Sequence, residues 1–353
     1  MGLPDAAGRP GCFDVDRQRI KLMKRNILAR KERDSWRKQL SQAIRTPAEL
    51  LELLDLTVKD EPANSRFPML VPRAFASRME PGNRQDPLLL QVLPDRDENR
   101  TAPGFSDDPV GDMASKAGRG ILHKYQGRVL LIATGACAVN CRYCFRQAFP
   151  YSSEHAGRDQ WQAAVEHIAN DNSIEEVILS GGDPLMLPTR RLAQLTEMLS
   201  GIRHIRCLRI HSRLPIVLPD RITDSLLEWL QSVPWPTVLV LHANHANELD
   251  EDVAAAVDRL RKIGVHVLNQ AVLLARVNDS VSKLAALMRR TFEIGALPYY
   301  LHLLDPVSGA QRFDTSEEHA RQLMEGLRRQ LSGYLVPRLV REVAGEPYKI
   351  PVL

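Results

Sequence analysis

From residue 129 onward, short apolar runs rich in β-branched residues alternate with windows in which apolar residues recur at helical spacing. We predict strands at the apolar runs, which are residues 129–134, 175–180, 205–212, 237–243, 265–274 and 297–305. The helical windows between or after them are centred near residues 165, 195, 227, 257, 287 and 323. Strict alternation of strands and helices is typical of βα units around a parallel sheet. The pattern therefore predicts an α/β fold.

Six βα units are too few for a closed eight-fold barrel, so the expected fold is an open, partial (β/α)6 barrel with its chemistry at the carboxyl ends of the strands. A helical extension precedes it, because Thr46-Pro47 before AELLELLDL is a helix start followed by helical apolar spacing. We divide the chain into 1–120, a helical region with a Pro- and Gly-rich connecting loop, 121–335, the partial barrel, and 336–353, a C-terminal segment.

Composition places the 353-residue chain among folded proteins, since 44% of its residues are hydrophobic and 25% are charged. No apolar run approaches the ~20 residues of a membrane helix, and no secretory signal opens the chain, so we expect a cytoplasmic protein without a membrane partner. Residues 1–50 hold twelve Lys or Arg and six Asp or Glu, which indicates a solvated helical face or a surface for an acidic partner. Sparse aromatic residues, 5% of the total, argue against binding of single-stranded nucleic acid.

Three of the five cysteines lie within eight residues, in the sequence CAVNCRYC directly after the strand expected at 129–134. An odd number of cysteines without an export signal favours metal or cluster ligation over disulfides. Cys137, Cys141 and Cys144 can surround one four-iron cluster and leave one iron open. Spacing alone leaves two alternatives, a redox pair at Cys141 and Cys144 or half of a zinc site.

The CxxxCxxC array, with the aromatic Tyr143 before its last cysteine, resembles the radical S-adenosylmethionine (SAM) superfamily. The resemblance implies a radical SAM barrel with a 4Fe-4S cluster on the three cysteines. It also implies SAM at the open iron and an electron donor such as flavodoxin or ferredoxin. The superfamily's glycine loop is matched by SGGDP, and a second binding segment by HANHANE. The residues assigned to SAM in this way are Ser180, Gly181, Gly182, Asp183, Asn244 and His245.

The chain ends in REVAGEPYKIPVL, where residue types alone leave open whether Lys349 is only a surface charge. Residues 120–351 resemble the lysine 2,3-aminomutase family throughout, including this ending of glycine loop, lysine and proline. The resemblance implies that Lys349 is the catalytic lysine and carries pyridoxal 5'-phosphate. The GEP loop and the segment SGYLVPRLVRE are similar to the branch that supplies β-lysine for elongation factor P.

Substrate-binding residues carry over from this family one at a time. Arg146, two positions after the last cysteine, corresponds to the arginine on the substrate carboxylate, a task that suits a guanidinium fork. Asp305 and Glu342 stand where the family binds the distal ammonium. Residue type alone leaves Asp305 open as a loop cap and Glu342 as a solvated charge. The residues assigned to pyridoxal phosphate are Tyr125, Gln270 and His302, of which the last two could instead be satisfied core groups.

The resemblance predicts an isomerase that converts L-lysine to β-lysine, as the R isomer, by a radical 1,2-amino shift. It implies a functional link to elongation factor P and its lysyl ligase. Three alternatives stay open: the same chemistry on another cationic amino acid, a radical SAM enzyme without pyridoxal phosphate, and a non-enzymatic iron–sulfur protein whose basic N-terminus binds nucleic acid or a protein. Cys12 and Cys207 are assigned no role.

Overall fold

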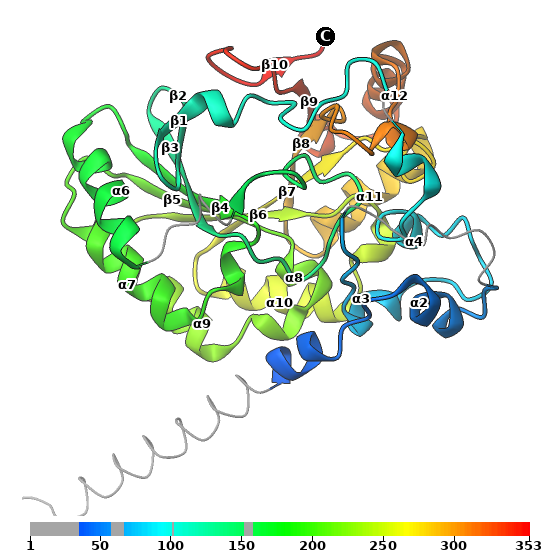
Figure 1. Ribbon diagram of the computed structural model, residues 1–353, viewed down its shortest axis with the longest axis horizontal. Helices are drawn as coiled ribbons and strands as arrows, with labels where there is room; N and C mark the ends of the chain where they lie inside the picture. The colour runs from blue at the N-terminus through cyan, green and yellow to red at the C-terminus, as the bar shows by residue number, and fades with distance from the viewer. Residues whose placement is uncertain (1–34, 58–66, 101, 152–157) are drawn as a thin grey trace, which may run out of the picture.

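The computed structural model describes residues 35–57, 67–100, 102–151 and 158–353, and these contain one ten-stranded sheet whose strands pair in chain order (Figure 1). The strands are β1 (Lys116–Gly118), β2 (Ile121–Tyr125), β3 (Arg128–Thr134), β4 (Glu176–Gly181), β5 (Cys207–Ser212), β6 (Thr237–His242), β7 (His266–Val272), β8 (Leu297–His302), β9 (Arg338–Arg341) and β10 (Ile350–Pro351). Strands β3 to β9 run parallel, whereas β1, β2 and β10 pair antiparallel at the two ends. Because the order starts at β1 and ends at β10, the described sheet is an open barrel.

Helices cover the outer face of this sheet (Figure 1). The longer ones follow the parallel strands in turn: α6 (Arg158–Asn170), α7 (Thr189–Ser200), α9 (Asp224–Ser232), α10 (Glu251–Lys262), α11 (Val281–Glu293) and α12 (Glu317–Gln330). Short helices are α2 (Pro47–Leu53), α3 (Arg73–Ala76), α4 (Pro87–Leu90) and α8 (Leu214–Val217). All six predicted strands and all six predicted helices are present, which confirms the partial α/β barrel.

The predicted number of parallel strands is too low by one. Strand β9 pairs parallel with β8 and extends the sheet beyond the six predicted βα units. Strands β1, β2 and β10 are also absent from the prediction. Each of these four strands has five residues or fewer. Such short strands are stabilised by the neighbours with which they pair, so their own residue pattern signals them only weakly.

The parallel strands present two different faces, because successive side chains point to opposite sides of a sheet. On the outer face Leu179, Leu208 and Leu239 are fully buried under the helices. The inner face carries polar side chains such as His211 and Gln270, which line a cavity. The polar inner face and the cavity that it lines make the interior of the barrel the candidate ligand site.

Residues before the barrel pack into the same hydrophobic core as the sheet, among them Trp36, Leu50 and Phe75. Thr46 caps α2 by accepting a hydrogen bond from the backbone N–H of Glu49 at 3.3 Å, as the Thr-Pro pair predicts. Among the described residues between 80 and 120, regular structure is limited to α4, β1, two 3-10 turns and an isolated bridge from Ser106 to Val307. None of the described helices combines the length and apolarity that a bilayer crossing requires.

The two cysteines without an assigned role are placed differently. Cys12 lies outside the described residues, as do most of the basic side chains of the first fifty residues. Cys207 begins β5 and is partly buried, and this burial raises the pKa of its thiol to about 11. The Cys207 thiol is therefore protonated near neutral pH and unreactive.

Candidate active site

The inner face of the sheet and the loops after its strands line a cavity that contains fifteen of the sixteen predicted site residues. They are Tyr125, Cys137, Cys141, Cys144, Arg146, Ser180, Gly181, Gly182, Asp183, Asn244, Gln270, His302, Asp305, Glu342 and Lys349. The exception is His245, whose ring accepts from the backbone N–H of Asn247 at 3.2 Å and caps the 3-10 turn Ala246–Glu248. The side chain of His245 therefore starts a helical turn outside the cavity lining, and its assignment to SAM stays a prediction.

The three cysteines occupy the loop after β3, where the CxxxCxxC motif places them. The backbone N–H of Asn140 donates to the carbonyl of Leu70 and holds this loop against the N-terminal region. Burial raises the pKa of the Cys137 thiol well above its usual value and that of Cys144 to about 11. Ligation to iron therefore releases protons. Three thiolates in one short loop are the donor set that a four-iron cluster takes while one iron stays open, so the residues present fit such a cluster.

The SGGDP loop lies directly against the cysteine loop. The backbone N–H of Gly182 donates to Thr134 O at 2.8 Å, and that of Asp183 donates to Ala136 O at 2.8 Å. The Asp183 carboxylate is fully engaged within the protein, because it accepts from the Ser212 hydroxyl at 2.8 Å and from three backbone N–H groups. Gly181 and Gly182 thus join two backbones that form one wall of the cavity.

Replacing Gly182 with alanine is expected to destabilise the protein by about 1–3 kcal/mol, because the added Cβ would lie 2.5 Å from the carbonyl oxygen of Ala136. The neighbouring atoms belong to the backbone of Gly135 and Ala136, so the clash can be relieved only by a shift of the loop. Thermal unfolding and the iron content after reconstitution measure the effect, and both are expected to fall. Gly201→Ala is the control, since no atom lies within 4 Å of its added Cβ. Equal melting temperatures for the two variants would contradict the prediction.

Five alternating charges form a chain along the cavity wall. The Arg146 Nε–H donates to Asp112 at 2.6 Å, and Lys124 Nζ lies 2.6 Å from the other oxygen of the same carboxylate. Lys124 also lies 2.8 Å from Glu342, whose second oxygen pairs with the ammonium of Lys349. Burial alone would raise the pKa of Glu342, but the ammonium groups of Lys349 and Lys124 outweigh it and lower that pKa to about 2. Glu342 is therefore ionised throughout the neutral range.

Asp305, after β8, differs from the other acidic groups in the cavity. Burial and repulsion from Glu342 raise the pKa of its carboxyl to about 7. Within the described residues no hydrogen bond or ion pair engages its side chain, which lines the cavity. A buried carboxyl without a partner is costly when ionised. The site therefore offers a cationic ligand an acidic group that the described residues leave unpaired.

Three neutral histidines line the interior beside Gln270. Burial lowers the pKa of His242 to about 3 and those of His211 and His302 well below their usual value. Gln270 Nε2 lies 2.9 Å from His242 Nε2. The Nε2 atoms of His211 and His302 have no hydrogen-bond partner among the described residues. Such buried, unmet ring nitrogens fit a ligand that itself carries polar groups, as pyridoxal phosphate does.

Several residues of the site are absent from the sequence prediction. Arg128 lies with its guanidinium carbon 4.7 Å from the centre of the Tyr125 ring and adds a cation to the wall that also carries Lys124. Arg209, from β5, lines the same cavity. Both arginines lie in strands that are otherwise mostly apolar, and this pattern in the sequence could have identified them as candidate site residues. Asp112 has no such pattern around it, because it lies in irregular structure. The tertiary structure brings it next to Arg146.

Comparison with known proteins matches residues 131–288 to the Radical SAM superfamily. The chain is 48% identical to the L-lysine 2,3-aminomutase of Escherichia coli (strain K12) over 325 residues, which cover 91% of this chain and 95% of that protein. It is 46% identical to the enzyme of the same name from Haemophilus influenzae, with 90% and 96% covered, and 33% identical to that of Clostridium subterminale, with 91% and 78% covered. A solved radical SAM methyltransferase from Sphaerobacter thermophilus aligns with 63% of this chain and 68% of its own, at 17% identity and a TM-score of 0.44.

Proposed function

Because the chain belongs to the L-lysine 2,3-aminomutase family within the radical SAM superfamily, we propose that it is an isomerase that converts L-lysine to β-lysine with pyridoxal phosphate as a third cofactor. One observation carries the proposal. A single cavity holds an arginine for a carboxylate, two acidic groups for an ammonium, a lysine able to carry an aldehyde cofactor, and three cysteines. These groups match the two charged ends of lysine and the cofactors of the family.

The residues present fit each cofactor. Cys137, Cys141 and Cys144 would hold the 4Fe-4S cluster, and the adjoining SGGDP loop would meet SAM. Lys349 would carry pyridoxal phosphate. Lys124 and Arg128 line the same cavity beside Tyr125 and would bind the phosphate group of this cofactor. Together these groups supply hydrogen-atom abstraction and an electronic path for moving an amino group between neighbouring carbons.

Arg146 is suited to bind the substrate carboxylate and to fix its plane. Its Nε–H is held by Asp112 at 2.6 Å and its Nη1 donates to the Ser180 hydroxyl at 3.3 Å. Asp112 is itself held by Lys124, so the guanidinium has one orientation before substrate arrives. Such preorganisation lowers the entropic cost of placing the reacting carbons.

The distal ammonium of lysine would be met by Asp305 and Glu342. In the described structure Glu342 pairs with the Lys349 ammonium. Because the substrate would take the place of Lys349 on the cofactor, the Lys349 amine would be free again in the substrate complex and would stay beside Glu342. Asp305, which no described residue engages, is therefore the first acid for the distal ammonium, and Glu342 would be shared between this ammonium and Lys349. The separation between these acids and Arg146 would then select the length of the side chain.

The pKa of Asp305 predicts a pH dependence for lysine turnover. Below a pH of about 7 this carboxyl is protonated and loses its attraction for an ammonium. As pH falls from 7 to 5, kcat/KM for lysine is therefore expected to fall about tenfold per unit. It should be level between pH 7.5 and 9, where the carboxylate and the ammonium of lysine are both charged. The profile of Asp305→Asn should lack this acidic limb, and persistence of the limb in that variant would rule out Asp305 as its source.

Finer features of the function are proposed on resemblance. The GEP loop and the SGYLVPRLVRE segment support a β-lysine product in the R configuration that serves elongation factor P and its lysyl ligase. Flavodoxin or ferredoxin would supply the electron. Thiols that ligate iron need a reducing compartment, which supports a cytoplasmic location. Chiral chromatography of the product tests the configuration.

Anaerobic turnover of the reconstituted protein tests the function itself. The mixture holds L-lysine, SAM, pyridoxal phosphate and a chemical reductant, and β-lysine is the expected product. Ornithine and arginine serve as comparison substrates, because each carries a distal cation at a different distance. If kcat/KM is higher for ornithine or for arginine than for lysine, that amino acid is the preferred substrate and the lysine assignment is wrong. If SAM is cleaved while all three amino acids stay unchanged, the protein is a radical SAM enzyme that acts on another substrate.

A further inference from the structure

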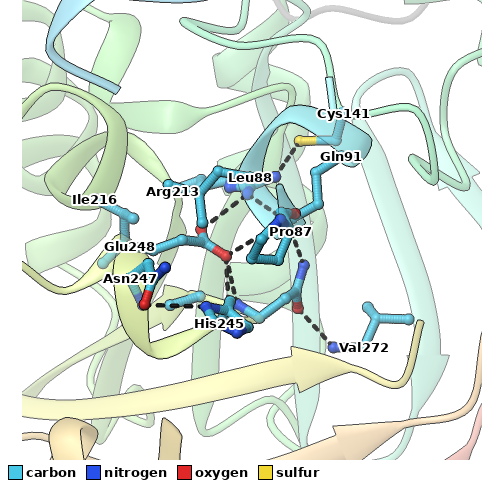
Figure 2. A network of polar contacts seen from close by, with 12 residues as sticks. Pro87, Leu88, Gln91, Cys141, Arg213, Ile216, His245, Asn247, Glu248 and Val272 are labelled. Carbon is cyan, nitrogen blue, oxygen red and sulfur yellow. Dashed lines mark hydrogen bonds and ion pairs between the residues drawn. The ribbon is translucent and has the colours of Figure 1, made fainter. Parts of the chain in front are cut away.

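A buried polar network lies behind Cys141 and centres on Arg213 (Figure 2). The Nη1–H of Arg213 donates to Cys141 Sγ at 2.7 Å and also to the hydroxyl of Tyr143. Its Nη2 donates to Gln91 Oε1 at 2.8 Å and to Glu248 Oε2 at 2.9 Å. One guanidinium therefore joins a cysteine sulfur to a carboxylate. Among the described residues, Cys141 is the cysteine of the three whose sulfur accepts from an arginine.

Glu248 fixes the orientation of this guanidinium. Its side chain is fully buried, and Arg213 is 6% exposed. The other oxygen of Glu248 accepts from Gln91 Nε2 at 3.0 Å and from the backbone N–H of Asn244 at 2.9 Å. Figure 2 shows Arg213 between Cys141 and Glu248. The guanidinium is thus anchored through both of its Nη atoms, whereas its buried Nε–H has no hydrogen-bond partner among the described residues.

A buried ion pair of this kind contributes little net stability, because removing two charges from water costs about as much as their attraction returns. Its position next to a cysteine of the iron-ligating motif suggests a different role. Hydrogen bonds and positive charge at the sulfurs of an iron–sulfur cluster favour the reduced form, since the added electron increases the negative charge on the cluster and its thiolates. The effect is strong where water is excluded.

We propose that Arg213 sets the one-electron reduction equilibrium of the cluster by donating to the Cys141 thiolate, and that Glu248 holds Arg213 in place while opposing its charge. The inference rests on the proposed function in one respect, the ligation of the cluster by Cys137, Cys141 and Cys144. In reduction, one electron passes from an external reductant to the cluster, and no bond to the protein changes. Arg213 is a positioning residue in this proposal because it acts through the cysteine sulfur.

Redox titration of the reconstituted cluster, followed by electron paramagnetic resonance without lysine or SAM, tests this role. Arg213→Gln removes the cation and is expected to make reduction at least tenfold less favourable, about 59 mV more negative for one electron. Glu248→Gln removes the opposing anion and is expected to shift the midpoint in the positive direction. Arg213→Lys should lie between Arg213→Gln and the wild type, because a single ammonium cannot reproduce the fork to both sulfur and carboxylate.

The opposite signs separate electrostatic control from simple damage, which would move both variants the same way. Arg78→Gln is the matched control, because buried Arg78 donates to the backbone carbonyl of Glu248 at 3.1 Å and pairs with Asp250, away from Cys141. The midpoint potential of Arg78→Gln should differ from that of the wild type by less than half of the shift measured for Arg213→Gln. Where a variant binds less iron, the midpoint potential is measured on the clusters that it does bind, because this potential does not depend on the concentration of the cluster. Shifts of one sign, or an Arg213→Gln midpoint equal to that of Arg78→Gln, would overturn the inference. A wild-type protein that forms no cluster would instead refute the cluster site itself.

Discussion

Lys349→Ala is expected to abolish β-lysine formation, with a loss of roughly a thousandfold or more in kcat, while cleavage of SAM by the reduced cluster continues. Lys349 lines the cavity and pairs with Glu342, so it is a preorganised amine close to the acids that would bind the substrate. Alanine cannot form a covalent bond to the cofactor aldehyde. The protein should also lose the visible absorption of bound pyridoxal phosphate.

The control for this variant is Lys262→Ala. Lys262 lies on α10 with its side chain 72% exposed, and its one ion pair among the described residues is with Asp258, one helical turn away. Its removal is expected to change stability and turnover little. Cofactor absorption, product formation and SAM cleavage are measured in parallel for both variants. Undiminished β-lysine formation by Lys349→Ala would show that Lys349 does not carry the cofactor and serves only as the ion-pair partner of Glu342.

Asp305→Asn is expected to lower kcat/KM for lysine by about 2–4 kcal/mol of binding energy, roughly 30- to 1,000-fold. The change keeps the shape of the side chain and removes its charge, so the distal ammonium would face a neutral amide. Melting temperature is expected to stay the same or to rise, because burial and Glu342 already disfavour the ionised form of Asp305 in the ligand-free protein.

The combination of lower activity with unchanged or higher stability separates substrate binding from a structural role. Asp314→Asn is a suitable control, since Asp314 is exposed and the one hydrogen bond that its carboxylate accepts within the described structure is local, from the backbone N–H of Thr315 at 3.0 Å. Steady-state kinetics and thermal unfolding are compared for the two variants. A melting temperature of Asp305→Asn that falls in step with its activity would mean that Asp305 supports the fold and not the substrate.

Sequence alone was sufficient for the repeating part of the fold. Each strand from β3 to β8 is apolar on the face under the helices, and each helix that follows is amphipathic, so local periodicity is enough to predict them. The CxxxCxxC and SGGDP motifs were equally informative, because backbone geometry after a strand fixes where a short loop can lie. The resemblance to the lysine 2,3-aminomutase family then added residues such as Lys349, which no local pattern distinguishes from a surface lysine.

Tertiary structure decided which side chains meet. Asp112 holds Arg146 from an irregular segment 34 residues earlier, and Lys124 reaches Glu342 across 218 residues. His245 sits inside a matching motif but caps a turn. The physical reason is the range of the interactions: helix and strand periodicity are properties of neighbouring residues, whereas a buried charge is satisfied by whichever group the folded chain brings within hydrogen-bonding distance. The sequence determined the barrel and its motifs, and the packing of distant segments determined the electrostatics of the site.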